Sequence, residues 1–343
     1  MKKTVYIILL VIIIAFMALS PPFIMEGLDK NIFNLKEKDQ KSQYTGNIEL
    51  WHVVSFKTGK GSGYSMLKAR SERFEKSKPY VFVNVQGITL DDAAARLMKG
   101  ERPDIISFPS GSIDTAKMVD LDIPDNIIDG LDGVCDNCTP YMYDSYVLLV
   151  NGDMLANKGI SRPMSGEMPS ELFDAALRGL LNCSDSSFSL VYSELAYKNK
   201  NKIMEHRFLS DETVLIDDGI TYGSYTDGID ESHFVSGNVP MFICPYSEYK
   251  SITENGNLVT FNVLCYPISY YTDLVQCIGV YNSDDTSKIE MCSEFALSLL
   301  KNGFQKQLED IEMFPVIELE NIYENNYERS AEYIRLTENG IFK

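Results

Sequence analysis

The sequence is poor in histidine, tryptophan and basic residues. It has 3 His and 1 Trp in 343 residues, and its 31 Lys and Arg stand against 49 Asp and Glu, which gives a formal net charge of −18. This acidic balance disfavours a protein that binds nucleic acid or an anionic lipid surface with a whole face. The sequence also lacks the GxSxG and HExxH patterns of hydrolases and zinc proteases. We therefore expect no catalytic residues, no cofactor and no nucleic-acid partner.

Cysteine is too sparse for a disulfide framework, since there are 7 in the chain and the number is odd. Cys135 and Cys138 form a CxxC motif in an acidic, loop-rich stretch. As a zinc half-site this motif lacks a second pair, and its acidic surroundings oppose a thioredoxin-like role. We expect a local disulfide and no metal, with two free thiols as the alternative. Four others lie in apolar runs and are expected to be small buried residues: Cys244, Cys265, Cys277 and Cys292.

The bulk composition is that of a globular protein. Hydrophobic residues make up 45% of the chain and charged residues 23%, and the length is enough for two cores of ordinary size. The 20 Tyr and 17 Phe serve cores first, and they also suit flat ligands such as sugar rings.

The first 25 residues differ from the rest of the chain. Lys2 and Lys3 precede an apolar run over residues 5–19, which is the pattern of a secretory signal. Cleavage after the small residues that follow would fall directly before Pro21, and no Cys is near enough for a lipid anchor. We expect residues 1–25 to be an uncleaved signal anchor that leaves the chain outside the cell, with a cleaved signal peptide as the alternative. The polar residues 26–45 are expected to be a tether.

From residue 46 onward, patterns of strand period alternate with patterns of helical period. This alternation predicts an α/β fold with a parallel sheet. The expected strands are 48–54, 80–85, 103–108, 145–150, 239–244 and 258–266, and the expected helices are 62–74, 90–99, 151–158, 170–181 and 289–308.

Five segments occur in the order found in one protein family. They read IELWH from residue 48, GERPDII from 100, LLVNGDML from 148, FVSGNVPM from 234, and FALSLLKNGFQ from 295 with FPV at 314. In this order they resemble the extracellular solute-binding proteins of sugar-type ABC importers. The resemblance covers residue 46 to about residue 315.

The resemblance implies the two-lobed periplasmic-binding-protein fold with crossing hinge strands. One lobe is expected over 46–149 with about 276–312, and the other over 150–275 with about 313–343. It further implies a monomer that binds a small solute between the lobes and presents it to ABC permease subunits. The chain is expected to act on the outer face of the cell membrane.

The candidate ligand residues are polar or aromatic side chains near strand ends, where open α/β sheets bind ligands. The loop 55–62 also precedes a helix N-terminus, whose N–H groups suit an oxygen-rich ligand. In the family an acidic residue before the crossing strand often holds sugar hydroxyls, and Asp144 matches it by position. The family commonly has a Trp after the strand 239–244, where this chain has tyrosines. The candidates are Trp51, His52, Phe108, Ser110, Tyr141, Tyr143, Asp144, Tyr246 and Tyr249.

Three functions compete at this point. The first is capture of a carbohydrate for an importer. The second is a membrane-anchored two-lobed sensor or adaptor that has lost or changed solute binding, because the lipobox and the usual Trp are missing. The third, an exported hydrolase, lacks any motif of its own.

Overall fold

The structure is a computed structural model that describes residues 44–54, 56–131, 133–157, 159, 190–206, 222–223, 230–254, 259–320, 322–323, 329–330 and 333–334. The chain divides into two units, Met1–Thr45 and Gly46–Lys343. The expected signal anchor, most of the tether and the helix predicted over 170–181 lie outside the described residues. Within the described residues, no helix combines the length and the hydropathy that crossing a membrane requires.

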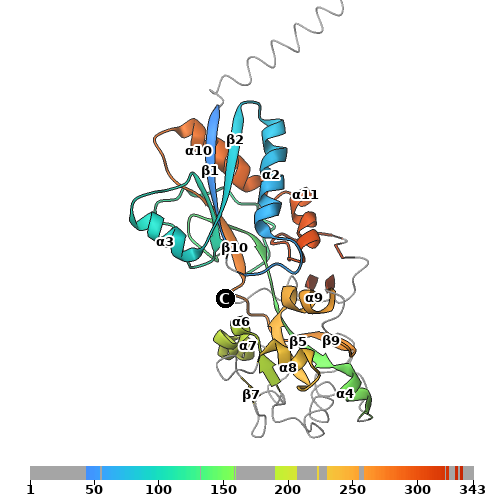
Figure 1. Cartoon of the computed structure of the whole chain (residues 1–343). Coiled ribbons are helices and arrows are strands. Elements are labelled where there is room, and N and C mark those ends of the chain that lie inside the picture. The colour runs from blue at the N-terminus through green and yellow to red at the C-terminus, as the bar shows by residue number, and fades with distance from the viewer. Residues whose placement is uncertain are drawn as a thin grey trace, which may run out of the picture. The chain divides into compact units, whose positions relative to one another are not determined.

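The first sheet contains five strands in the order β2-β1-β3-β10-β4 (Figure 1). β1 is parallel to β2 and β3, whereas β10 is antiparallel to both β3 and β4. The sheet is therefore mixed and not purely parallel as predicted, because β10 returns to it from the far end of the sequence. Its strands are β1 (Gly46–Val53), β2 (Val81–Ile88), β3 (Ile105–Pro109), β4 (Thr139–Tyr143) and β10 (Val275–Val280).

Helices α2 (Gly63–Ser77) and α10 (Thr286–Ser298) join their apolar faces beside this sheet. The Ser62 hydroxyl accepts a hydrogen bond from the Ser65 N–H at 3.1 Å, so the predicted helix start is confirmed. Phe74 of α2 meets Phe295 of α10 edge to face, with ring centroids 5.2 Å apart. A third helix, α3 (Leu90–Met98), follows β2.

The helix predicted over 289–308 is wrong at its C-terminal end. α10 ends near Leu299 because Lys301 is extended, and α11 (Asn302–Gln305) and a 3-10 helix (Lys306–Ile311) follow. The break turns the Gln305 side chain inward, where its Nε2 donates to two backbone carbonyls at 2.8 and 2.7 Å and its Oε1 accepts from a backbone N–H at 2.8 Å. These buried backbone groups would lose their partners in a continuous helix.

The second sheet also has five strands, in the order β7-β6-β8-β5-β9. β5 is antiparallel to β8 and β9, while β6 is parallel to β7 and β8. The strands are β5 (Tyr146–Asn151), β6 (Leu190–Tyr192), β7 (Tyr222–Gly223), β8 (Met241–Pro245) and β9 (Val263–Pro267). The helices around it are α4 (Gly152–Asn157), α6 (Glu194–Lys198), α7 (Lys200–Glu205), α8 (Glu231–Val235) and α9 (Tyr246–Glu254).

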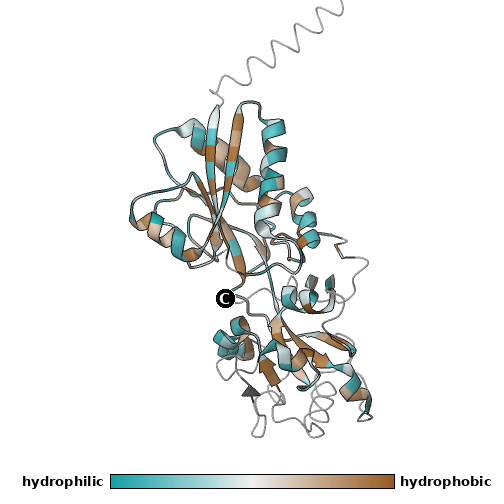
Figure 2. Cartoon of the chain, viewed as in Figure 1, coloured by the Kyte–Doolittle hydropathy of each residue, from teal (hydrophilic) through white to brown (hydrophobic). Residues whose placement is uncertain are grey.

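Each sheet carries a core of its own. In Figure 2 the strands of the second sheet are largely brown, whereas α2, α6 and α7 are largely teal. All six residues of β5 are buried, which a strand covered on both faces requires.

From one described strand to the next, the chain passes between the two sheets twice. It leaves the first sheet after β4 and enters the second at β5, and it returns between β9 and β10. The predicted α/β architecture with two sheets and crossing segments is confirmed.

Candidate functional site

Asp144 lies where the chain crosses from β4 to β5, and it ties the two crossings together. Its N–H donates to the Leu274 carbonyl at 2.9 Å, and its carbonyl accepts from the Thr272 hydroxyl at 2.6 Å. Its carboxylate accepts from the Ser145 N–H at 2.9 Å and from the Ser247 N–H at 3.1 Å. Ser247 belongs to the first turn of α9, so the carboxylate also faces the positive end of that helix.

The Asp144 carboxyl is fully buried. Burial raises its pKa to about 6, while the hydrogen bonds from Ser247 and Ser145 and the charge of Arg329 act in the opposite direction. Near neutral pH it is therefore an anion held by backbone N–H groups.

Three of the predicted tyrosines gather near Phe314 beside this crossing, where Tyr143 directly precedes Asp144 and Tyr246 directly precedes Ser247. Tyr143 stacks on Phe314 with centroids 5.4 Å apart, and Tyr246 meets the same ring edge to face at 5.2 Å. Tyr249 lies beside Tyr246 at 5.6 Å. The guanidinium of Arg329, which pairs with Glu312, is 5.0 Å from the centre of Phe314. The structure thus brings together two pairs of candidates, Tyr143 with Asp144 and Tyr246 with Tyr249, and the two pairs are about 100 residues apart in the sequence.

His52 and Tyr141 form a second group, linked through Ser107. The Ser107 hydroxyl lies 3.0 Å from His52 Nδ1 and 2.9 Å from the Tyr141 hydroxyl, and it accepts from Gln276 Nε2 at 3.0 Å. Burial lowers the pKa of His52 to about 4, so the imidazole is neutral at physiological pH. The Gly63 position at the start of α2 is close to this ring, since a Cβ there would lie 3.1 Å from His52 Nε2.

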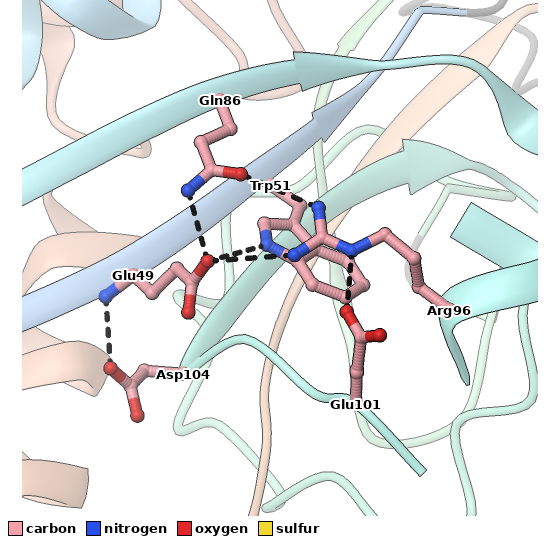
Figure 3. A network of polar contacts seen from close by, with 6 residues as sticks. All are labelled: Glu49, Trp51, Gln86, Arg96, Glu101 and Asp104. Carbon is pink, nitrogen blue, oxygen red and sulfur yellow. Dashed lines mark hydrogen bonds and ion pairs between the residues drawn. The ribbon is translucent and has the colours of Figure 1, made fainter. Parts of the chain in front are cut away.

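Trp51 lies apart from both groups. Successive strand residues point to opposite faces of the sheet, so Trp51 and His52 diverge. Figure 3 shows the Trp51 ring beneath the Arg96 guanidinium, which is 3.8 Å from the ring centre. The indole N–H donates to Glu49 Oε1 at 3.0 Å, and the same oxygen accepts from Gln86 at 3.0 Å. In this conformation the only Trp of the chain is 1% exposed.

The two candidates after the third strand serve the first sheet in this conformation. Phe108 is fully buried and pairs with Cys277 across β3 and β10. Ser110 is half-buried, and its hydroxyl donates to the Val134 carbonyl at 3.2 Å. Neither belongs to the Asp144 group or the His52 group described above.

The segment 56–61, which joins β1 to α2, contacts the core of the second sheet, the start of α9 and the end of the 3-10 helix Lys306–Ile311. Phe56 packs against the core of the second sheet, and the Lys60 N–H donates to the Ile311 carbonyl at 3.4 Å. Gly59 fits so closely that a Cβ there would lie 3.1 Å from the Ser247 carbonyl oxygen. Part of the loop that was predicted to meet a ligand thus contacts the start of α9.

Glu248 adds a second acidic group beside this loop. Burial raises its pKa to about 7, and the charge of Glu231 adds to the shift. The hydrogen bond with Ser193 and the charge of Lys57, which belongs to the loop, partly oppose it. The start of α9 therefore carries a carboxyl group that titrates near neutral pH.

A scan against protein-family models and a search of the curated proteins found no match for this chain. Solved structures do match. The cyclic α-maltosyl-1,6-maltose binding protein of Arthrobacter globiformis aligns over 88% of both chains with a TM-score of 0.64 and 14% identity. UgpB of Mycobacterium tuberculosis, solved with glycerophosphocholine, aligns over 88% of both chains at 0.59 and 12%.

A third match is the extracellular solute-binding protein family 1 member of Alicyclobacillus acidocaldarius, with a TM-score of 0.55, 13% identity, and coverage of 87% of this chain and 86% of that one. The chain has the solute-binding-protein fold. The resemblance of the sequence motifs to this class is thereby confirmed for the architecture.

Sequence reasoning missed several residues of this solute-binding-protein fold that hold the candidate groups together. Ser107 and Gln276 are single polar residues inside apolar strands, which is a signal for a buried hydrogen-bond partner. Phe314 and Arg329 gave no such signal, because their contacts depend on how the C-terminal segment returns to the crossing.

Proposed function

We propose that this chain captures a carbohydrate outside the cell and delivers it to an ABC importer. The observation that carries the proposal is the grouping of one buried carboxylate with three tyrosines at the crossing between two sheets of a solute-binding-protein fold. Solved proteins of this fold include one named for binding a cyclic maltose derivative and one solved with acarbose.

The chemistry of the group suits a sugar. Each Asp144 oxygen accepts one backbone N–H and keeps further acceptor capacity for a sugar hydroxyl. Tyrosine rings offer flat apolar faces for a pyranose and hydroxyls for its polar edge. Because these side chains are buried here, we propose that binding requires the contacts of segment 56–61 with the start of α9 to open. A hinge movement about the two crossings would open them.

The proposal also assigns the lobe boundaries, the location of the protein and its partners. We assign residues 46–149 with about 276–312 to one lobe and 150–275 with about 313–343 to the other. Residues 1–25 are proposed to anchor a monomer to the outer face of the membrane, with residues 26–45 as the tether. The proposed partners are the solute and the permease subunits, and no catalytic step is assigned.

The test is a thermal-shift and calorimetric screen of the full chain with maltooligosaccharides, raffinose, acarbose and glycerophosphocholine. A ligand at about 100 times its Kd stabilises the folded state by about 2.7 kcal/mol, so a true ligand raises the melting temperature by several degrees. Asp144→Asn should weaken binding about tenfold or more, because it removes the charge that a hydroxyl donates to. Asp92→Asn, on the exposed face of α3, is the matched control.

Two results would contradict the proposal. One is that no carbohydrate raises the melting temperature, whether or not glycerophosphocholine raises it. The other is that Asp144→Asn binds the sugar as tightly as the unchanged chain. A complete lack of response to solutes would favour the sensor or adaptor function.

A further inference from the structure

Three cysteine sulfurs lie close together where the loop that precedes β4 meets β10. Cys135 and Cys138 form a disulfide in that loop, and Cys277 belongs to β10. The three Sγ atoms all lie within 4.8 Å of one another. Cys277 is fully buried, Cys138 is 8% exposed and Cys135 is half-buried.

The backbone positions these sulfurs through two local features. Asn137, inside the CxxC motif, has a φ of 53°, which turns the chain tightly between the two cysteines. Cys277 pairs with Pro140 in β4, two residues after Cys138, and a register shift opposite Gln276 and Cys277 leaves Tyr141 as an extra residue that bends β4 at this point. Two sulfurs from one turn and a third from a distant strand is the layout of a thiolate metal site.

We infer that, once the disulfide is reduced, Cys135, Cys138 and Cys277 bind a soft divalent cation such as Zn²⁺ or Cd²⁺. Three sulfurs about 2.3 Å from one zinc ion are roughly 4 Å from each other. The Cys135 and Cys138 sulfurs, which are bonded in the disulfide, would therefore move apart by roughly 2 Å on reduction, whereas Cys277 Sγ already lies within 4.8 Å of both. Among the described residues, no His or carboxylate joins the group, so water would complete the coordination.

The chemistry makes the site conditional on redox state. A dithiol reductant converts the Cys135–Cys138 disulfide to two thiols and itself becomes a cyclic disulfide, so two electrons and two protons pass to the protein. Metal binding to the three thiols then releases their protons, because the thiolate is the ligand. Exchange with a small-molecule disulfide, which accepts the two electrons and is reduced to two thiols, re-forms the Cys135–Cys138 bond, removes two ligands and expels the ion.

Metal binding would join the loop before β4 to β10, the strand that directly follows the return crossing from the second sheet. This consequence does not depend on whether the bound solute is a sugar. The inference therefore stands or falls separately from the proposed function.

The experiment uses the full chain in mild detergent, reduced with a phosphine, which does not compete as a thiol ligand. Anaerobic titration with Cd²⁺ is followed by ultraviolet thiolate-to-cadmium charge transfer, and competition with a chromophoric chelator gives the Zn²⁺ affinity. We expect one ion per chain and about one third less charge-transfer intensity in Cys277→Ala, with affinity at least about tenfold lower, or about 1.4 kcal/mol.

Two further variants keep the test decisive. Cys135→Ala removes a ligand from the loop without altering the buried strand and should weaken binding in the same way. Cys265→Ala, at a half-buried cysteine outside the group, should bind the metal as the unchanged chain does. Circular dichroism checks that each variant is folded.

Three results would overturn the inference: the reduced chain takes up no ion, the oxidised chain binds it equally well, or Cys277→Ala and Cys135→Ala bind it as tightly as Cys265→Ala.

Discussion

Replacing Glu248 with Gln should change how the stability of the protein depends on pH. The side chain is half-buried at the start of α9, where desolvation raises the pKa of its carboxyl group from 4.5 to about 7. A raised pKa means that the folded chain holds this proton more tightly than the unfolded chain. The resulting stabilisation is fully present below pH 4.5 and is lost as the pH rises through 7.

The magnitude follows from the two pKa values. A shift from 4.5 to about 7 makes the folded state about 2–3 kcal/mol more stable at about pH 5 than at about pH 8 through this group alone. Gln is neutral at both pH values, so it makes no pH-dependent contribution to stability. Glu248→Gln should therefore gain about 2–3 kcal/mol of stability relative to the unchanged chain when the pH rises from about 5 to about 8.

Urea denaturation of both proteins, followed by circular dichroism at the two pH values, measures this difference. Comparing the variant with the unchanged chain at each pH removes the contribution of all other titrating groups. Glu72→Gln, on the exposed side of α2, is the control and should show no such pH-dependent gain. The reasoning is refuted if the stability difference between Glu248→Gln and the unchanged chain is the same at both pH values.

Three further predictions concern contacts that hold the candidate site. Gly59→Ala should lower stability by about 1–3 kcal/mol through overpacking, as measured by thermal melting. Gly303→Ala is the control, because an added Cβ there meets open space, and it should leave the melting temperature unchanged. Equal melting temperatures of the two variants would contradict the close fit at Gly59. Arg96→Ala should uncover the ring of Trp51, the only Trp, and shift its fluorescence emission to the red; unchanged emission would show that other groups cover the ring. Gln305→Ala should cost about 3 kcal/mol in urea denaturation because it leaves buried backbone groups without partners, and a loss below about 1 kcal/mol would contradict this role.

The elements with clear local signals were predictable from the sequence. β1 alternates apolar and polar residues in its first half, and Ser62 is a typical helix cap, so both were placed within about two residues. β10 was not placed as a strand, since all six of its residues are buried and it shows no alternation. β4 contains Pro140, which argues against an interior strand on local grounds, and only its neighbours explain it.

The candidate site was predictable only in part. The position of Asp144 before the crossing strand followed from the number of residues between it and the end of that strand in the sequence. The partner of its second oxygen, Ser247, is 103 residues away, and no local pattern connects the two. The separation of Trp51 from His52 was implied by strand geometry and was overlooked. The nearness of Cys277 to the CxxC motif depends on the register of β10 and could not be read from spacing.

The position of β10 between β3 and β4 has a consequence for synthesis of the chain. When residues up to 267 have emerged from the ribosome, the five described strands of the second sheet have all been made. The first sheet still lacks β10, the strand between β3 and β4. β3 and β4 then have exposed edges towards each other, and an edge of this kind is a site for pairing with other chains. The half of the protein that is made first is thus the half that closes last. Until β10 arrives, a nascent or truncated chain would depend on holding factors to avoid aggregation.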